Sequence, residues 1–302
     1  MLPTQTAYFL ALISAILFSG ASVVFAQFSQ NYSSLWMNIV KNSVALLAFV
    51  IASLLLWMVG AENYRTLERM SVFCFLASGF IGLAIGDYFL FQGFKRIGSA
   101  RTLMVFSFSP LFLSIGAFTA FGQKLSAYQL LALFFLIACV WTISYERFRF
   151  DGKWEWLGIL YAFLGVILDN IGVLLTRRGF DLSPGTNAFT ANAFRCIGAV
   201  LLFSLLQRGG ALKVWRDLQN LPIEKKKMVY GASFLGTFLS LSLWLTAVKI
   251  GHIASLAGVG AFNPIAASIW EWWLHKKRPT IYFCTSLLLF LIGFMLLLRH
   301  EG

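Results

Sequence analysis

The chain has 302 residues, of which 59% are hydrophobic and only 12% are charged, and its mean hydropathy is +0.78. Soluble domains carry about 25% charged residues, so this composition excludes an ordinary soluble protein. The formal charge is +12, but the basic residues lie between apolar runs. We therefore interpret them as contacts with anionic lipid headgroups and expect no nucleic-acid partner.

Apolar runs close to the length of a membrane-spanning helix recur along the whole chain. They predict an all-α integral membrane protein with ten transmembrane helices, at residues 6–26, 35–59, 70–94, 102–121, 127–145, 156–176, 187–207, 228–248, 254–274 and 280–298. The connections are short and rich in Gly, Pro, Ser and charge. The longest connection, residues 208–227, has room for a short surface helix.

The first run ends at Val24-Phe25-Ala26, which resembles a signal-peptidase site. No basic residue precedes the run, however, and the run is longer than the apolar core of a signal peptide, so we expect a retained first helix. The four cysteines all lie inside apolar runs without Cys-x-x-Cys spacing. They are interpreted as small apolar residues, without disulfides or metal ligation.

A shift of 154 positions carries Asn38-x-x-Lys41 onto Asn192-x-x-Arg195, and Phe108-Ser109-Pro110 onto Phe262-Asn263-Pro264. Residues 1–150 therefore form one five-helix repeat and residues 151–302 the second. Because five is odd, the second repeat enters the membrane from the opposite side, which gives two inverted five-helix repeats. Inverted repeats of this kind are typical of secondary transporters.

The basic residues are distributed unevenly over the two ends of the predicted helices. The odd-numbered connections carry 15 Lys and Arg, and the even-numbered connections with the C-terminal tail carry 7. Taken literally, the positive-inside rule puts both chain termini outside the cell. Lys41 and Arg195 are the two remaining basic residues, and both fall deep inside apolar runs.

An ionised side chain at mid-membrane costs at least about 2.5–3.5 kcal/mol on insertion scales, so such residues usually face a bundle interior or a cavity. Asn38, Lys41 and Asn42 share one helix face, and Asn192 and Arg195 do the same. We predict that these residues line a polar path and bind the anionic part of a substrate. The alternative is structural, with each cation paired to a nearby acid to lock the bundle.

Three acidic residues fall inside predicted spans. Asp87, followed by Tyr88, and Asp169, followed by Asn170, are candidates for coupling a proton or for binding a substrate amine, or they act as counter-ions of the two buried cations. Glu271 lies near the end of its run among Trp270, Trp272 and Trp273, so we interpret it as an interfacial residue in an aromatic belt.

Other residues are candidates to shape or line a central cavity. Pro110 and Pro264 fall at matched positions inside spans, where each predicts a kink. Asn263, Ser107 and Ser109 beside them offer polar contacts, and Trp36 and Tyr88 are predicted substrate contacts. The faces formed by Gly79, Gly82, Gly86, Gly231 and Gly236 predict close helix packing. No nucleophile, phosphate-loop or metal-binding signature occurs, so we predict no catalytic residue, metal or cofactor.

The chain resembles the drug/metabolite transporter superfamily, in particular the EamA-type family of ten-helix proteins. The likeness rests on the duplicated unit, on Lys95-Arg96-Ile97-Gly98-Ser99-Ala100 with Phe108-Ser109-Pro110-Leu111, and on the turn Gly122-Gln123-Lys124-Leu125-Ser126. Gln123, and Lys276-Lys277-Arg278 in the second copy, depart from the family's Gly-Glu-Arg-Leu-Thr. The resemblance implies a secondary transporter of amino acids, nucleotide-like compounds or other small metabolites. It also implies cytoplasmic termini, opposite to the charge count, and we adopt that orientation.

These observations predict a multi-pass transporter in a bacterial plasma membrane, working by alternating access on a small polar metabolite such as an amino acid. Its partners would be that substrate, a proton or exchanged solute, and the lipid bilayer, and it would act as a monomer or homodimer. A channel would need a continuous polar lining, and a membrane-embedded enzyme a convergent nucleophile or metal set. Both remain alternatives.

Overall fold

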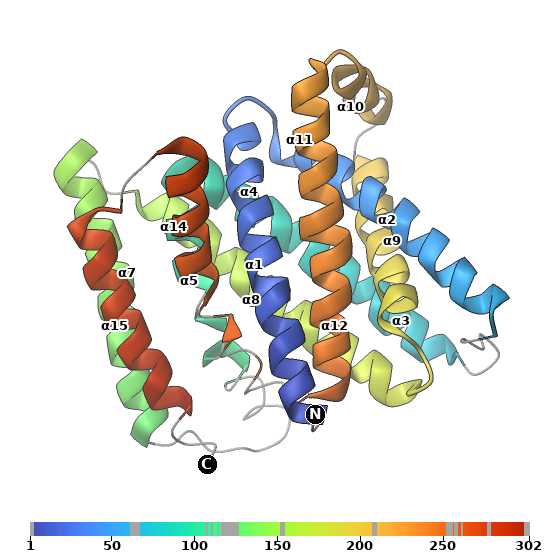
Figure 1. The fold of residues 1–302 in the computed structure, drawn as a ribbon, viewed down its shortest axis with the longest axis horizontal. Helices are drawn as coiled ribbons and strands as arrows, with labels where there is room; N and C mark the ends of the chain where they lie inside the picture. The colour runs from blue at the N-terminus through green and yellow to red at the C-terminus, as the bar shows by residue number, and fades with distance from the viewer. Residues whose placement is uncertain are drawn as a thin grey trace.

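The computed structural model describes residues 3–60, 67–106, 108–109, 111–113, 115, 127–151, 155–206, 210–251, 256, 259–260, 262–276 and 279–298. Within these residues the regular structure is entirely helical, which confirms the predicted fold class. Eight of the ten predicted spans coincide with a helix or a continuous helical run (Figure 1). The fourth and ninth are helical at residues 102–106 and 262–274, and parts of both lie outside the described residues. The part of the fourth span at residues 116–121 and the turn at 122–126 lie outside the described residues.

The first half contains five spans. They are α1 (Pro3–Ser29), α2 (Ser34–Met58), the continuous run α3 (Arg69–Ser78), η2 (Gly79–Gly86) and α4 (Asp87–Ile97), then α5 (Ser99–Phe106) and α7 (Ala127–Asp151). Gly98 separates α4 from α5 with φ of 82°, a conformation that a side chain would strain. The fourth span therefore begins at a sharp turn directly after the third.

The second half repeats this order. Its spans are α8 (Trp156–Leu182), α9 (Ala188–Leu206), the run α11 (Ile223–Ser233), η3 (Phe234–Leu239) and α12 (Ser240–Ile250), then α14 (Phe262–His275) and α15 (Ile281–Leu298). The short helix α10 (Gly210–Gln219) lies in the longest connection, as the sequence predicted. It packs against α2, and its Val214 and Leu218 are buried.

The helices present apolar side chains outward, as lipid contact requires. In α2, for example, Asn38, Lys41 and Asn42 are buried while Leu47, Leu55 and other apolar residues are exposed. Five helical runs among the described residues are long and apolar enough to cross a membrane, and four shorter apolar helices accompany them. The amide and ammonium side chains of α2 therefore lie inside the bundle.

The contacts between the two halves are reciprocal (Figure 1). Helix α1 packs against η3, α12 and α14 of the second half, and α8 packs against η2, α4 and α5 of the first. Helices α2 and α9 pack against each other, and so do α7 and α15 at the edge of the molecule. Every such contact has its counterpart after exchange of the halves, as expected for a duplicated five-helix unit.

The third and eighth spans each contain a π-helical segment, η2 and η3, at corresponding positions. Such wider turns disturb the backbone hydrogen-bond ladder and are frequent at functional sites. Side-chain amides supply extra donors here: Asn38 donates to the Ala84 carbonyl at 3.3 Å, and Asn42 to the Leu83 carbonyl at 3.4 Å. In the second half, Asn192 donates to the Leu241 carbonyl of α12 at 3.1 Å.

Glycines let backbones approach closely at these segments, as predicted. A Cβ on Gly79 would lie 1.8 Å from the backbone oxygen of Arg195, and a Cβ on Gly236 would lie 2.0 Å from the Cβ of Ala21. Neither position leaves room for a side chain. Gly231 differs, because nothing lies within 4 Å of the corresponding position, so its predicted packing role is wrong.

Two further positions differ from the sequence interpretation. Pro264 lies in the first turn of α14, where a missing N–H disturbs no helical hydrogen bond, so it marks a helix start and not a kink within a helix. Pro110 lies outside the described residues. Lys276 has φ of 51° directly after α14, the left-handed conformation typical of a helix end, and it occupies the position of Gly122 in the first repeat.

Candidate functional site

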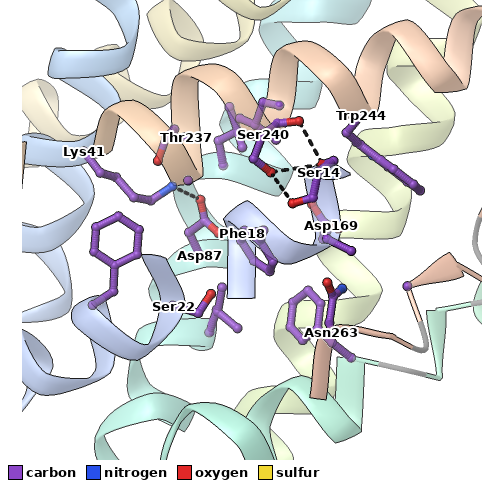
Figure 2. A pocket seen from close by; sticks show the side chains of 18 of the residues that line it. Ser14, Phe18, Ser22, Lys41, Asp87, Asp169, Thr237, Ser240, Trp244 and Asn263 are labelled. Atoms are coloured by element: carbon purple, nitrogen blue, oxygen red, sulfur yellow. Dashed lines mark hydrogen bonds and ion pairs between the residues drawn. The ribbon is translucent and has the colours of Figure 1, made fainter. Parts of the chain in front are cut away.

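A cavity of about 130 Å³ lies between the two halves (Figure 2). Its wall is built by α1, α2, η2 and α4 from the first half and by α8, α9, η3 and α12 from the second, with Phe106, Ser109, Gly260 and Asn263 completing it. All four charged residues predicted from the sequence as buried in spans, Lys41, Asp87, Asp169 and Arg195, line this one cavity.

Lys41 and Asp87 form a closed ion pair on one side of the cavity. The Lys41 Nζ lies 2.5 Å from the Asp87 Oδ2, and the two side chains are only 7% and 14% exposed. The ammonium also lies 5.8 Å from the centre of the Phe91 ring. The first buried cation is thus neutralised by an acid of its own repeat, as the structural interpretation of Lys41 predicted.

Arg195 is bound differently. It donates from Nε to the Ser78 hydroxyl at 3.0 Å and from Nη1 to the Asn192 amide oxygen at 3.2 Å. Ser78 in turn bonds the Gly172 carbonyl and the Thr176 hydroxyl, both at 2.7 Å. Within the described part of the chain, no carboxylate forms an ion pair with Arg195, and its Nη2 has no hydrogen-bond partner. Neutral groups therefore hold the second cation at the cavity wall.

Asp169 of α8 faces the cavity near Ser14, Asn263 and Trp244 (Figure 2). Among the described residues it makes no hydrogen bond and no ion pair. Gly82 of η2 leaves space beside it, since a Cβ there would lie 3.7 Å from the Asp169 Oδ1. The neighbouring Ser14 and Ser240 hydroxyls donate to each other's backbone carbonyls, at 2.8 and 3.1 Å, and not to the carboxylate.

Aromatic side chains form part of the wall. They are Phe18, Phe25, Phe91, Phe94, Phe106 and Trp244, and aliphatic, small and hydroxyl residues lie between them. Aromatic faces attract cations and pack against apolar groups. The cavity therefore combines a neutralised ion pair, a guanidinium and a carboxylate that do not contact each other, and apolar walls between them.

Ser22 of α1 is a cavity residue that sequence reasoning missed. It is fully buried, and its hydroxyl has no hydrogen-bond partner among the described residues. Other hydroxyls in the spans bond the carbonyl one turn earlier, as Ser233 does to Val229 and Ser242 to Phe238. Serines are common in these spans, so no sequence signal distinguishes Ser22; only its orientation does.

The remaining predicted residues lie apart from the cavity. Asn38, Asn42 and Asn192 do not line it and instead bond backbone carbonyls of the neighbouring spans. Trp36 stacks on Tyr32 at 4.4 Å between ring centres, and Tyr88 contacts the ring of Phe89. Of the ten predicted site residues, the structure brings together Lys41, Asp87, Asp169, Arg195 and Asn263. Within the described residues, no cluster of side chains fits a metal ion.

Comparison with known proteins supplies the family. No curated protein matches the sequence. A solved structure described only as "Crystal structure of protein" superposes with a TM-score of 0.68 at 14% identity, covering 99% of this chain and 100% of its own; at that identity the likeness establishes the fold alone. The model of the EamA-like transporter family matches twice, at residues 5–145 and 156–299, once in each half. The chain therefore belongs to the EamA-like transporter family.

Proposed function

We propose that this member of a family of small-molecule transporters is a secondary active transporter. It moves a small polar metabolite, an amino acid or a related compound, across the membrane by alternating access. The observation that carries the proposal is the cavity between the halves, where Arg195 and Asp169 face the same space without forming an ion pair. Inverted-repeat transporters place their substrate at such an interface.

The charges in the cavity favour a substrate that carries both signs. Lys41 and Asp87 neutralise each other, which leaves one guanidinium and one carboxylate for a ligand. A buried charge is costly unless it is paired and hydrogen-bonded. A zwitterion would supply a carboxylate to Arg195 and an ammonium to Asp169, and the aromatic walls would pack against its apolar part.

Asp169 can alternatively carry the coupling proton. A carboxylate that forms no ion pair in a low-dielectric cavity can exist in both protonation states during a transport cycle. Proton coupling and amine binding both need the acid to be free of a permanent partner, which distinguishes Asp169 from Asp87. An exchanged solute of the same class would occupy the same cavity.

The direct test is a metabolite screen on purified protein, read as a rise in melting temperature. A ligand at 100 times its dissociation constant stabilises the folded state by about 2.7 kcal/mol. Zwitterionic amino acids should raise the melting temperature of the parent protein and not that of Arg195→Met. Saturable, countertransport-stimulated uptake into proteoliposomes should follow for the same compounds. Stabilisation only by anions or only by cations would contradict the zwitterion, and non-saturable flux would favour a channel.

A further inference from the structure

A second polar cluster lies outside the cavity, at the ends of α5, α7, α14 and α15. It consists of Ser99, Arg101, Glu146, Glu271 and Thr280, which we call the clamp. The Glu271 carboxylate accepts hydrogen bonds from the Ser99 hydroxyl and, at 3.3 Å, from the backbone N–H of Ala100. It thus satisfies donors in the first turn of α5, where a negative charge also complements the helix dipole.

The other part of the clamp is a buried ion pair. Arg101 donates to both carboxylate oxygens of Glu146, at 3.0 and 2.8 Å, and the Glu146 side chain is only 1% exposed. The Thr280 hydroxyl donates to the same carboxylate at 2.7 Å and accepts the backbone N–H of Phe283 at 3.1 Å. Bidentate Arg–carboxylate pairs are among the stronger and most directional polar contacts in proteins.

The clamp joins the two halves next to the cavity. Glu271 and Thr280 belong to the second repeat, and their partners Ser99 and Glu146 to the first. Along α5, Ser99 lies about 10 Å from the cavity residue Phe106, and along α14 Glu271 lies about 12 Å from the cavity residue Asn263, at 1.5 Å per residue. The clamp therefore ties together the helices that carry part of the cavity wall.

A tight packing contact lies next to the clamp. The Trp270 ring of α14 packs against α1 at Gly20, where a Cβ would lie 2.9 Å from the ring, and its Nε1 donates to the Ile16 carbonyl at 3.3 Å. Helix α14 is thereby held to α1 through Trp270 and to α5 through Glu271.

The sequence positions that correspond to Glu271, Arg101 and Glu146 do not repeat the residues of the clamp. The shift of 154 positions that relates the repeats places Ala117 opposite Glu271, Ser255 opposite Arg101, and His300 opposite Glu146. None of these can reproduce the carboxylate contacts. These three positions lie outside the described residues, so the comparison is one of sequence: the shift supplies no second copy of the Glu271 and Glu146 carboxylates.

We propose that the clamp is a one-sided gate. It closes the transport path on the face that carries the connections after α4, α7, α9 and α14, and it must break before the cavity reaches that face. Because the corresponding positions of the sequence carry no carboxylate, the transporter without substrate rests with the clamp face closed. This inference rests on alternating access as proposed above, but it concerns which face is closed and not what is transported.

The test is access of a membrane-impermeant maleimide to one cysteine in the cavity. Thr237 lines the cavity, so Thr237→Cys in a protein whose four native cysteines are replaced by alanine provides the reporter. Right-side-out and inverted vesicles expose the two faces separately. A second reporter, Gln219→Cys at the exposed end of α10, identifies the clamp face, which shares that side with the connection between α9 and α11.

Glu271→Ala should raise the rate of cavity labelling from the clamp face about tenfold, equal to about 1.4 kcal/mol in the equilibrium between the two conformations. Glu271→Gln, which keeps an acceptor oxygen, should lie between the parent and Glu271→Ala. Glu224→Gln is the matched control, because Glu224 pairs only with Lys227 of its own helix and should leave labelling unchanged. Ser99→Ala tests the same contact from its donor side if Glu271→Ala fails to fold.

Unchanged labelling from the clamp face in Glu271→Ala, Ser99→Ala and the double variant Arg101→Met/Glu146→Leu would overturn the proposal. So would increased labelling only from the opposite face. The readout needs no substrate, so failure here would leave the transport proposal standing. Conversely, if no transported ligand were found, the labelling experiment would still test whether the clamp closes one face.

Discussion

Methionine at position 41 should destabilise the protein, whereas methionine at position 195 should not. In the parent protein the Asp87 carboxylate lies 2.5 Å from the Lys41 ammonium, and only 14% of the Asp87 side chain is exposed. Lys41→Met removes this ammonium and leaves the buried carboxylate without a partner. Removing one partner of a buried ion pair costs about 3–5 kcal/mol. With an unfolding entropy of about 2.1 cal/mol/K per residue over 302 residues, this lowers the melting temperature by about 5–8 °C.

A second substitution separates the ion pair from other effects of Lys41. Asp87→Leu in the Lys41→Met background removes the stranded carboxylate, and it should restore most of the lost melting temperature because apolar replacements of buried pairs are often neutral. Arg195→Met loses two hydrogen bonds to neutral groups but also removes a buried charge. Its melting temperature should stay near that of the parent, while ligand affinity should fall at least about tenfold.

The assay is thermal unfolding of purified protein with and without ligand. Equal losses in Lys41→Met and Arg195→Met would refute the distinction between a paired and a ligand-facing cation. A failure of Asp87→Leu to recover stability would show that Lys41 acts through something other than Asp87. Unchanged ligand stabilisation in Arg195→Met would remove Arg195 from the substrate site.

Four further variants test two cavity residues and the packing of two glycines. Asp169→Asn should abolish the pH dependence of net transport while leaving exchange largely intact if the acid couples protons, whereas loss of ligand stabilisation at every pH would assign it to the substrate amine. Ser22→Ala should weaken ligand binding by about 1 kcal/mol, or roughly fivefold, without lowering the melting temperature of the empty protein, since no internal hydrogen bond is lost; a lower melting temperature would indicate an internal partner. Gly79→Ala should prevent normal folding because its Cβ would lie 1.8 Å from the Arg195 backbone oxygen, whereas Gly231→Ala should be neutral or stabilise by up to about 1 kcal/mol; similar expression and melting temperatures for these two variants would contradict the packing argument.

Most of the fold follows from hydropathy, because each span must bury its polar backbone and present apolar side chains to lipid. That constraint predicted α2 at residues 35–59, where the helix runs from Ser34 to Met58. It also left a connection long enough for α10. The π-helical segments η2 and η3 were not predictable in the same way. Their glycines signal close packing, but a change in hydrogen-bond register depends on which neighbouring amides reach the backbone, and only the tertiary structure determines that.

The candidate site was also predictable only in part. Lys41, Asp87, Asp169 and Arg195 were predictable because a charge within a span is too costly to face lipid. Their pairing was not, since the helix spacing that groups Asn38 with Lys41 says nothing about the helix opposite. The partners of Glu271 were not predictable either. Its tryptophan neighbours suggested a headgroup position, and Trp272 and Trp273 are indeed exposed, but its carboxylate reaches the first turn of α5.

The positions at which the two repeats differ identify the substrate-facing residues better than the positions at which they agree. Lys41 and Arg195 correspond, but the position equivalent to Asp87 is Leu241, so the second cation has no partner of the kind that neutralises the first. The same shift of 154 positions places Asp169 opposite Ala15. Both apolar counterparts line the same cavity. If both halves carried both acids, each buried cation would have a permanent partner and no charge would be left for a ligand. Because each acid occurs in one half only, the cavity keeps one internal pair and leaves Arg195 and Asp169 free to engage a substrate.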